Sequence, residues 1–176
     1  SAAAAQPSAV GRSSGPRRSR CRIVSPSSNS SAAEIEIASS LSARQKGVVF
    51  DVILPADPAL AIDGDPQILS AIVVNLVQNA IKFTAAMGHV VVGADATAER
   101  VRIYVSDQCG GLPAGVVTSM TTPFQQHSRD RSGLGLGLFI ARRGAAAHDG
   151  DIDVQDLPGT GCVFSLHVPR AARRTQ

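Results

Sequence analysis

Two carboxamide side chains, Asn75 and Asn79, stand one helical turn apart in an otherwise apolar stretch. A carboxamide oxygen suits Mg²⁺, which usually takes one or two protein oxygens and completes its coordination with phosphates and water. Lys82 follows, where its ammonium group could face a phosphate. The same residues could also form an ordinary solvated face, and the pattern alone leaves both interpretations open.

Asp107 is a second candidate, because it ends an apolar stretch and precedes Gln-Cys-Gly-Gly. A carboxylate beside glycines, where a ligand can approach the backbone, can accept a hydrogen bond from an amino group such as that of adenine. Such a bond is worth about 1.5–3 kcal/mol, or roughly 10- to 150-fold in affinity. An ordinary aspartate at a strand end is the alternative.

Three alternating glycines, Gly133, Gly135 and Gly137, form the third candidate. They leave backbone N–H groups accessible ahead of a predicted helix, whose positive end favours phosphate. Taken alone, this spacing is equally consistent with turn chemistry.

One helix must carry the first candidate. It is predicted from Pro66 to about Thr84, because Asp65 offers an N-cap, proline suits the first helical position and apolar residues recur with helical period. Its polar residues share one face: Asn75, Gln78, Asn79 and Lys82.

The other elements mix strands and helices. The alternation over 34–38 predicts a short strand, and 39–47 is weakly helical. Further strands are predicted at 48–54, 89–97, 100–107, 151–156 and 162–169, a long loop at 110–132 and a helix at 139–148. This order predicts an α+β fold, with helices covering one face of a mixed, largely antiparallel sheet.

Composition limits the kind of core. The 176 residues suit one domain. Apolar residues make up 44% but aromatic ones only 3%, so the core must be aliphatic and stacking platforms for nucleic-acid bases are not expected. No apolar run approaches the roughly 18–20 residues of a membrane helix, which predicts a soluble segment without membrane contact. Three cysteines without a CxxC pair predict no disulfide framework and a reducing, cytoplasmic setting.

Charge divides the chain into three parts. Residues 1–33 hold five Arg and no acid among many Ser and Ala, which predicts a disordered linker, with an organelle transit peptide as the alternative. Residues 170–176 form a basic tail. The domain between them, 34–169, carries all the acids and a formal charge of −5 (9 minus 14), so the high pI does not indicate nucleic-acid binding.

Four stretches occur together in one order: NLVQNAIKFT, DQCGGLP, GLGLGLFIAR and PGTGCVF. With IDGDPQIL ahead of them, they resemble the ATP-binding catalytic domain of sensor histidine kinases, in the GHKL superfamily with gyrase, the chaperone Hsp90 and MutL. The resemblance covers about residues 34–169. It implies the Bergerat fold, a two-layer α/β sandwich with a flexible ATP lid.

The resemblance also implies roles for residues in these stretches. Asn79 would bind Mg²⁺, Asn75 would lie beside the triphosphate of ATP, Lys82 near a phosphate, and Asp107 would bind adenine. The remaining residues implied at the nucleotide site belong to the same stretches or to the lid: Gly111, Leu112, Phe124, Gly133, Leu134, Gly135, Leu136, Gly137 and Thr160.

Two positions depart from the family's pattern. Cys109 stands where glycine is usual, so its side chain could narrow the adenine pocket. Met120 stands where a lid phenylalanine is common, which predicts looser packing of the lid.

The position of Asn75 separates subclasses. Relatives that hydrolyse ATP typically carry a glutamate there as general base, and an asparagine cannot take up a proton at neutral pH. This implies transfer to a histidine, which needs little activation, with help from Mg²⁺, Lys82 and the lid arginines Arg129 and Arg131. An appreciable intrinsic ATPase rate would count against it.

The acceptor histidine is expected outside this chain. None of the four histidines resembles an acceptor, and His148 is expected to be structural. The implied partners are a His-containing dimerisation domain, in cis in a longer protein or in trans, and indirectly a response regulator. Two alternatives are a non-catalytic GHKL nucleotide-binding module and the mitochondrial protein kinases of the superfamily, which carry a glutamate at the position of Asn75.

Overall fold

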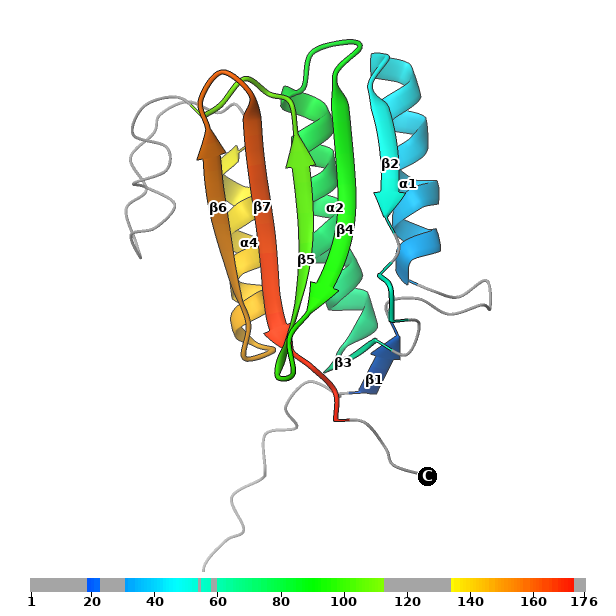
Figure 1. Cartoon of the computed structure of the whole chain (residues 1–176), viewed down its shortest axis with the longest axis vertical. Coiled ribbons are helices and arrows are strands. Elements are labelled where there is room, and N and C mark those ends of the chain that lie inside the picture. The colour runs from blue at the N-terminus through cyan, green and yellow to red at the C-terminus, as the bar shows by residue number, and fades with distance from the viewer. Residues whose placement is uncertain (1–18, 23–30, 54, 58–59, 113–133, 173–176) are drawn as a thin grey trace, which may run out of the picture.

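The computed structural model describes residues 19–22, 31–53, 55–57, 60–112 and 134–172 (Figure 1). The elements follow one another as β1 (Ser19–Arg22), α1 (Ser31–Lys46), β2 (Val49–Ile53), β3 (Ala61–Gly64), α2 (Pro66–Phe83), β4 (His89–Ala96), β5 (Arg100–Asp107), α4 (Leu134–Ala146), β6 (Asp151–Leu157) and β7 (Gly161–Pro169).

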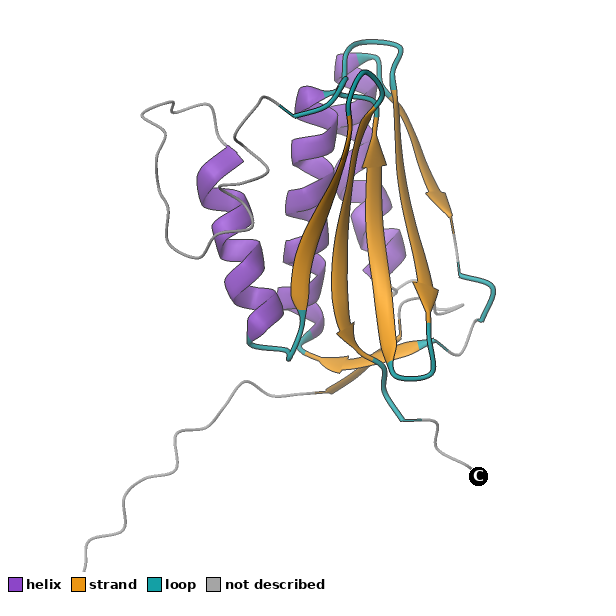
Figure 2. Ribbon diagram, turned by 60° about the vertical axis from the view of Figure 1, so that its left-hand side comes forward, coloured by secondary structure: helices purple, strands orange, loops and turns teal. Residues whose placement is uncertain are grey.

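A five-stranded sheet forms one layer of the molecule, in the order β2-β4-β5-β7-β6. Its strands pair antiparallel except β2 and β4, which are parallel. The three helices α1, α2 and α4 cover one face of the sheet (Figure 2). The predicted α+β sandwich with a mixed, largely antiparallel sheet is therefore confirmed.

The helix α2 forms as its sequence predicts. The Asp65 carboxylate accepts hydrogen bonds from the backbone N–H groups of Gln67 and Ile68, and Pro66 occupies the first helical turn. The apolar stripe is buried at Leu69, Ile72, Val73, Leu76, Val77, Ala80 and Ile81. The polar face predicted from the sequence is left outside this stripe.

The core between the layers is aliphatic. Phe164 is the only aromatic side chain among the buried core residues of the described chain. On β5 the side chains of Val101, Ile103, Val105 and Asp107 alternate with more exposed neighbours and are themselves buried. Because strand side chains have a period of two, Asp107 continues a buried apolar row.

The prediction of a strand at 34–38 was wrong, because these residues belong to α1. Ile35, Ser39 and Ala43 are buried at helical spacing, whereas Ile37 is 76% exposed and Leu41 63% exposed. The alternating isoleucines matched a strand pattern, but only one of them faces the core. The predicted helix at 139–148 likewise begins earlier, at Leu134, so that Gly135 and Gly137 lie in its first turn.

The chain ends also differ from the predicted linker and tail. Residues 1–33 include β1, which pairs antiparallel with β3, and the start of α1 at Ser31. Neither β1 nor β3 was predicted from the sequence. Within 170–176, Arg170 donates to Asp57 at 2.8 Å, and the N–H of Ala171 donates to the carbonyl of Ala61 at 2.9 Å. These long-range contacts have no local signal in the sequence.

None of the described helices is both long and apolar enough to cross a membrane.

Candidate functional site

The topology of the chain places the candidate site at one end of the sheet. The C-terminal ends of α2 and β5, the first turn of α4 and the turn between β6 and β7 all lie at one end of the molecule (Figure 1). These are the elements that carry the four stretches singled out in the sequence.

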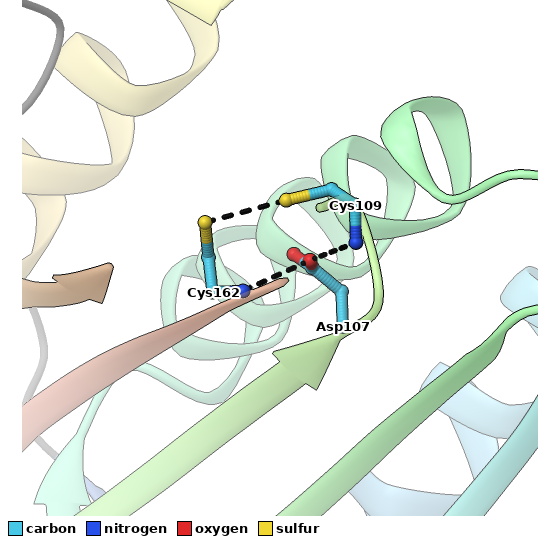
Figure 3. Close-up of side chains that lie close together, drawn as sticks. All are labelled: Asp107, Cys109 and Cys162. Atoms are coloured by element: carbon cyan, nitrogen blue, oxygen red, sulfur yellow. Dashed lines mark hydrogen bonds between the residues drawn. The ribbon is translucent and has the colours of Figure 1, made fainter. Parts of the chain in front are cut away.

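Asp107 is the buried charged group at this end, with only 5% of its surface exposed. One carboxylate oxygen, Oδ1, accepts hydrogen bonds from two backbone N–H groups, Cys109 at 2.9 Å and Cys162 at 3.2 Å (Figure 3). Backbone donors on a carboxylate offset the cost of burying it. They also fix its orientation, and neither bond uses the second oxygen, Oδ2, which suits an amino group of a ligand.

The turn after β6 packs on the segment after β5. The N–H of Gly110 donates to the carbonyl of Thr160 at 3.3 Å, and the N–H of Gly159 donates to the carbonyl of Gly110 at 2.9 Å. The N–H of Leu112 donates to the Asp156 carboxylate at 2.9 Å. The structure therefore brings Thr160 beside the segment that carries Asp107, Gly111 and Leu112, although Thr160 is about 50 residues away in the sequence.

Two glycines make this contact possible. A Cβ at Gly161 would lie 1.8 Å from the carbonyl oxygen of Asp107, so no side chain fits there without a backbone shift. Gly111 has a φ of +104°, which L residues rarely adopt. The backbone is therefore close-packed directly beside the buried carboxylate.

Asn75 joins α2 to the first turn of α4. Its side-chain nitrogen Nδ2 donates to the carbonyl oxygen of Gly137 at 2.8 Å, and a Cβ at position 137 would lie 2.5 Å from the side-chain oxygen Oδ1 of Asn75. Further along α4, a Cβ at Gly144 would lie 2.9 Å from Ile72. Gly137 therefore has a packing role, and its implied contact with phosphate stays a prediction.

Asn79 and Lys82 continue the face of Asn75 towards the C-terminal end of α2. Asn79 is half-buried and Lys82 is exposed, with its Nζ atom 5.2 Å from the ring centroid of Phe83. The implied roles of Asn79 towards a metal ion and of Lys82 towards a phosphate stay predictions.

Several predicted residues lie outside the described part of the chain: Phe124, Arg129, Arg131, Gly133 and Met120. Leu134, Gly135 and Leu136 fall in the first turn of α4, where their backbone is described. The predictions about the lid are therefore not tested by the structure.

His148 is fully buried and joins two helices. Its Nε2 atom lies 3.0 Å from the N–H of Asp65, and its Nδ1 atom lies 2.8 Å from the carbonyl oxygen of Gly144. The first contact makes Nε2 an acceptor and the second makes Nδ1–H a donor, which is one neutral tautomer. The predicted structural role of His148 is confirmed.

Sequence analysis missed the pairing of two thiols beside Asp107. The sulfur atoms of Cys109 and Cys162 lie 3.3 Å apart (Figure 3). Burial raises the pKa of the Cys109 thiol, with a further contribution from its hydrogen bond to Asp107, and burial likewise raises the pKa of the Cys162 thiol. Two features of the sequence could have indicated this pair. Cys109 departs from the family pattern, and Cys162 lies within the last of the four stretches, PGTGCVF.

The layered fold and the stretches gathered at one end of its sheet define a histidine kinase-type ATP-binding catalytic domain. The catalytic domain of the histidine kinase ThkA superposes with a TM-score of 0.72 at 23% identity, covering 86% of this chain and 95% of that one. The full-length kinase ShkA in complex with AMPPNP gives a TM-score of 0.70 at 29% identity, over 82% of this chain and 30% of that one.

Residues 64–172 match the model of the "Histidine kinase-, DNA gyrase B-, and HSP90-like ATPase" family, and the chain belongs to this family. Its members bind ATP. Sensor histidine kinase RcsC of Escherichia coli (strain K12) is 38% identical over 117 residues, which cover 64% of this chain. The chain spans 12% of the length of that relative.

Proposed function

We propose that this chain binds ATP and Mg²⁺ and acts as the catalytic domain of a two-component sensor histidine kinase. The observation that carries the proposal is the buried Asp107 carboxylate, held by two backbone N–H groups at the end of β5. Its Oδ2 atom would accept a hydrogen bond from the adenine amino group. Gly111, Leu112 and Thr160 would line the space around the base, because the segment after β5 and the turn after β6 are held together beside the end of β5.

The face of α2 and the start of α4 fit the triphosphate. Asn79 would supply a carboxamide oxygen to Mg²⁺, and Lys82 would face a phosphate. Gly135 and Gly137 lie in the first turn of α4, a 13-residue helix whose first N–H groups have no partner within the helix and favour anions. When bound, Mg²⁺ would neutralise phosphate charge and orient the γ-phosphoryl group for transfer.

Transfer would rest on positioning rather than on proton abstraction. Asn75 has no basic group, and its Nδ2 atom already donates to the carbonyl of Gly137. A histidine nitrogen would attack the γ-phosphorus as the bond to the β-phosphate oxygen breaks and ADP leaves. Arg129 and Arg131 of the lid would stabilise the charge on the transferred group.

The partners of this reaction would lie outside the chain. The acceptor histidine would belong to a dimerisation domain, in cis or in trans, and the phosphoryl group would then pass to a response regulator. In support, ThkA has been solved in complex with the response regulator protein TrrA, and that kinase superposes here with a TM-score of 0.69 at 21% identity, over 88% of this chain and 42% of that one. We place the reaction in the cytoplasm, where ATP is available and free thiols persist.

The direct test is ATP binding in the presence of Mg²⁺, measured by calorimetry on the whole chain. Asp107→Asn keeps an oxygen for the two backbone N–H groups but removes the charge, and we expect affinity to fall by roughly 10- to 150-fold. Asn79→Ala should remove the dependence on Mg²⁺. Asp63→Asn on the exposed face of β3 is the matched control and should bind as the wild type does. Unchanged affinity in Asp107→Asn would refute the assignment of adenine.

A second experiment separates a kinase from a non-catalytic nucleotide-binding module. A purified histidine kinase dimerisation hairpin is supplied with labelled ATP and the chain, and a hairpin lacking its histidine is the control. Label on the intact hairpin supports the kinase. ATP binding without transfer would favour the non-catalytic module. Release of free phosphate at an appreciable rate would favour an ATPase.

A further inference from the structure

A pair of thiols lies beside Asp107, whose carboxylate we propose binds adenine. Cys109 follows the end of β5, and Cys162 lies on β7 directly opposite Asp107 in the sheet register. Figure 3 shows the two sulfur atoms facing each other, and their separation is 3.3 Å. A disulfide needs about 2.0 Å between sulfurs, so the two sulfur atoms must approach by about 1.3 Å.

The two cysteines differ in access. Cys162 is fully buried, whereas Cys109 is half-buried. A small oxidant therefore reaches Cys109 first, and Cys162 is placed to react with the oxidised sulfur from inside.

We propose that Cys109 and Cys162 form a reversible oxidation site, in which a hydroperoxide closes a disulfide that weakens nucleotide binding at Asp107. The sulfur of Cys109 attacks one peroxide oxygen, giving a sulfenic acid and releasing water or an alcohol. The sulfur of Cys162 then displaces the sulfenic oxygen as water, and the S–S bond forms. Two thiols lose two electrons and two protons, and hydrogen peroxide becomes two molecules of water.

The carboxylate connects this chemistry to nucleotide binding. The same Oδ1 atom of Asp107 accepts from the backbone N–H groups of both cysteines, so the carboxylate is oriented by the two residues that the disulfide would draw together. Cys162 is held within the sheet, so the movement falls on the segment after β5. There Gly110 has a φ of +87°, and a Cβ built on it would meet no atom within 4 Å, so this side of the segment has space for a shift. The effect of the disulfide on nucleotide binding rests on the proposed function.

The local charges predict slow oxidation at neutral pH. The carboxylates of Asp107 and Asp156 face the thiols, and Asp156 lies 3.7 Å from the sulfur of Cys162. Since burial raises the pKa of the Cys109 thiol, little reactive thiolate is present near pH 7, and the rate should rise with pH. A soft metal ion is the other occupant that these groups suggest, because the ligand atoms of Asp107, Cys109 and Cys162 lie within 4.8 Å of one another. Such an ion would need the thiols deprotonated, which burial opposes.

The test uses the whole chain carrying Cys21→Ser, which leaves these two thiols. The β1 strand that carries Cys21 lies at the opposite end of the molecule (Figure 1). The protein is treated with hydrogen peroxide with and without EDTA, and free thiols, intact mass and crosslinked peptides are measured. We expect both thiols to be lost within one chain, a mass decrease of about 2 Da for the two hydrogens, and a peptide joining Cys109 to Cys162.

Nucleotide binding is then compared before and after oxidation. We expect ATP affinity to fall by about tenfold or more, as for loss of a charged hydrogen bond, and dithiothreitol to restore it. Cys162→Ala should give no crosslink, and Cys109→Ser should bind ATP equally before and after peroxide. Sulfinic acid on Cys109 without a crosslink, thiols that react only after EDTA removes a metal, or a crosslink with unchanged affinity would each overturn the proposal. If the reduced protein does not bind ATP, the proposed function fails, while peptide mapping still decides whether the disulfide forms.

Discussion

Replacing Gly137 with alanine should destabilise the protein, although the same substitution usually stabilises a helix. Gly→Ala within a helix normally stabilises by about 0.5–1 kcal/mol. Here the new Cβ would lie 2.5 Å from the side-chain oxygen of Asn75 and 2.9 Å from its side-chain nitrogen. Either α4 must move away from α2, or Asn75 must rotate and lose its bond to the Gly137 carbonyl. We expect a net destabilisation of about 1–3 kcal/mol, the range for overpacking.

A double-mutant cycle isolates the cause. Asn75→Ala removes the atoms that the new Cβ would meet, so Gly137→Ala added to Asn75→Ala should recover the normal helix gain of about 0.5–1 kcal/mol. All four proteins are unfolded in urea, with midpoints compared at a common m value. The reasoning is refuted if Gly137→Ala stabilises the wild-type chain, or if it destabilises both backgrounds equally.

Three further predictions concern stability. His148→Ala should lower the free energy of unfolding by about 3 kcal/mol or more, since it empties a buried site and leaves the N–H of Asp65 without its acceptor; urea unfolding measures this, and a loss below about 1 kcal/mol would contradict it. Gly161→Ala should be far more costly than Gly159→Ala, because the first Cβ would lie 1.8 Å from the carbonyl of Asp107 whereas the second meets open space at a φ of +79°. In reducing buffer, the free energy of unfolding should fall as pH rises above about 8.5, the usual thiol pKa, because burial raises the thiol pKa in the folded state and the native chain then holds more protons than the unfolded one. The Cys109→Ser/Cys162→Ala variant should show a shallower fall, and identical pH curves would refute this cause.

Local signals account for the elements that carry most of the site. The cap and the apolar stripe predicted α2 almost residue by residue, and alternation predicted β5 with Asp107 at its end. The prediction failed at α1, where two isoleucines satisfy a strand pattern although only Ile35 is buried. It also missed β3, because the partner of this strand is β1, far away in the sequence. Local patterns show which residues are apolar. The two errors arose because burial in α1 and strand pairing in β3 depend on contacts with distant segments.

At the site, too, the sequence predicted the functional side chain but not the contacts that surround it. Sequence patterns singled out Asp107 as a hydrogen-bond acceptor, but its orientation comes in part from the N–H of Cys162, which the register of β5 and β7 places opposite it. That register also decides what the departure at Cys109 means. A glycine at 109, which the family resemblance implies as the usual residue, would leave Cys162 as a buried thiol beside the carboxylates of Asp107 and Asp156, without a second sulfur. With cysteine at 109, two thiols lie beside the proposed adenine site. The residue that was expected only to narrow the pocket therefore makes a reversible oxidation possible there.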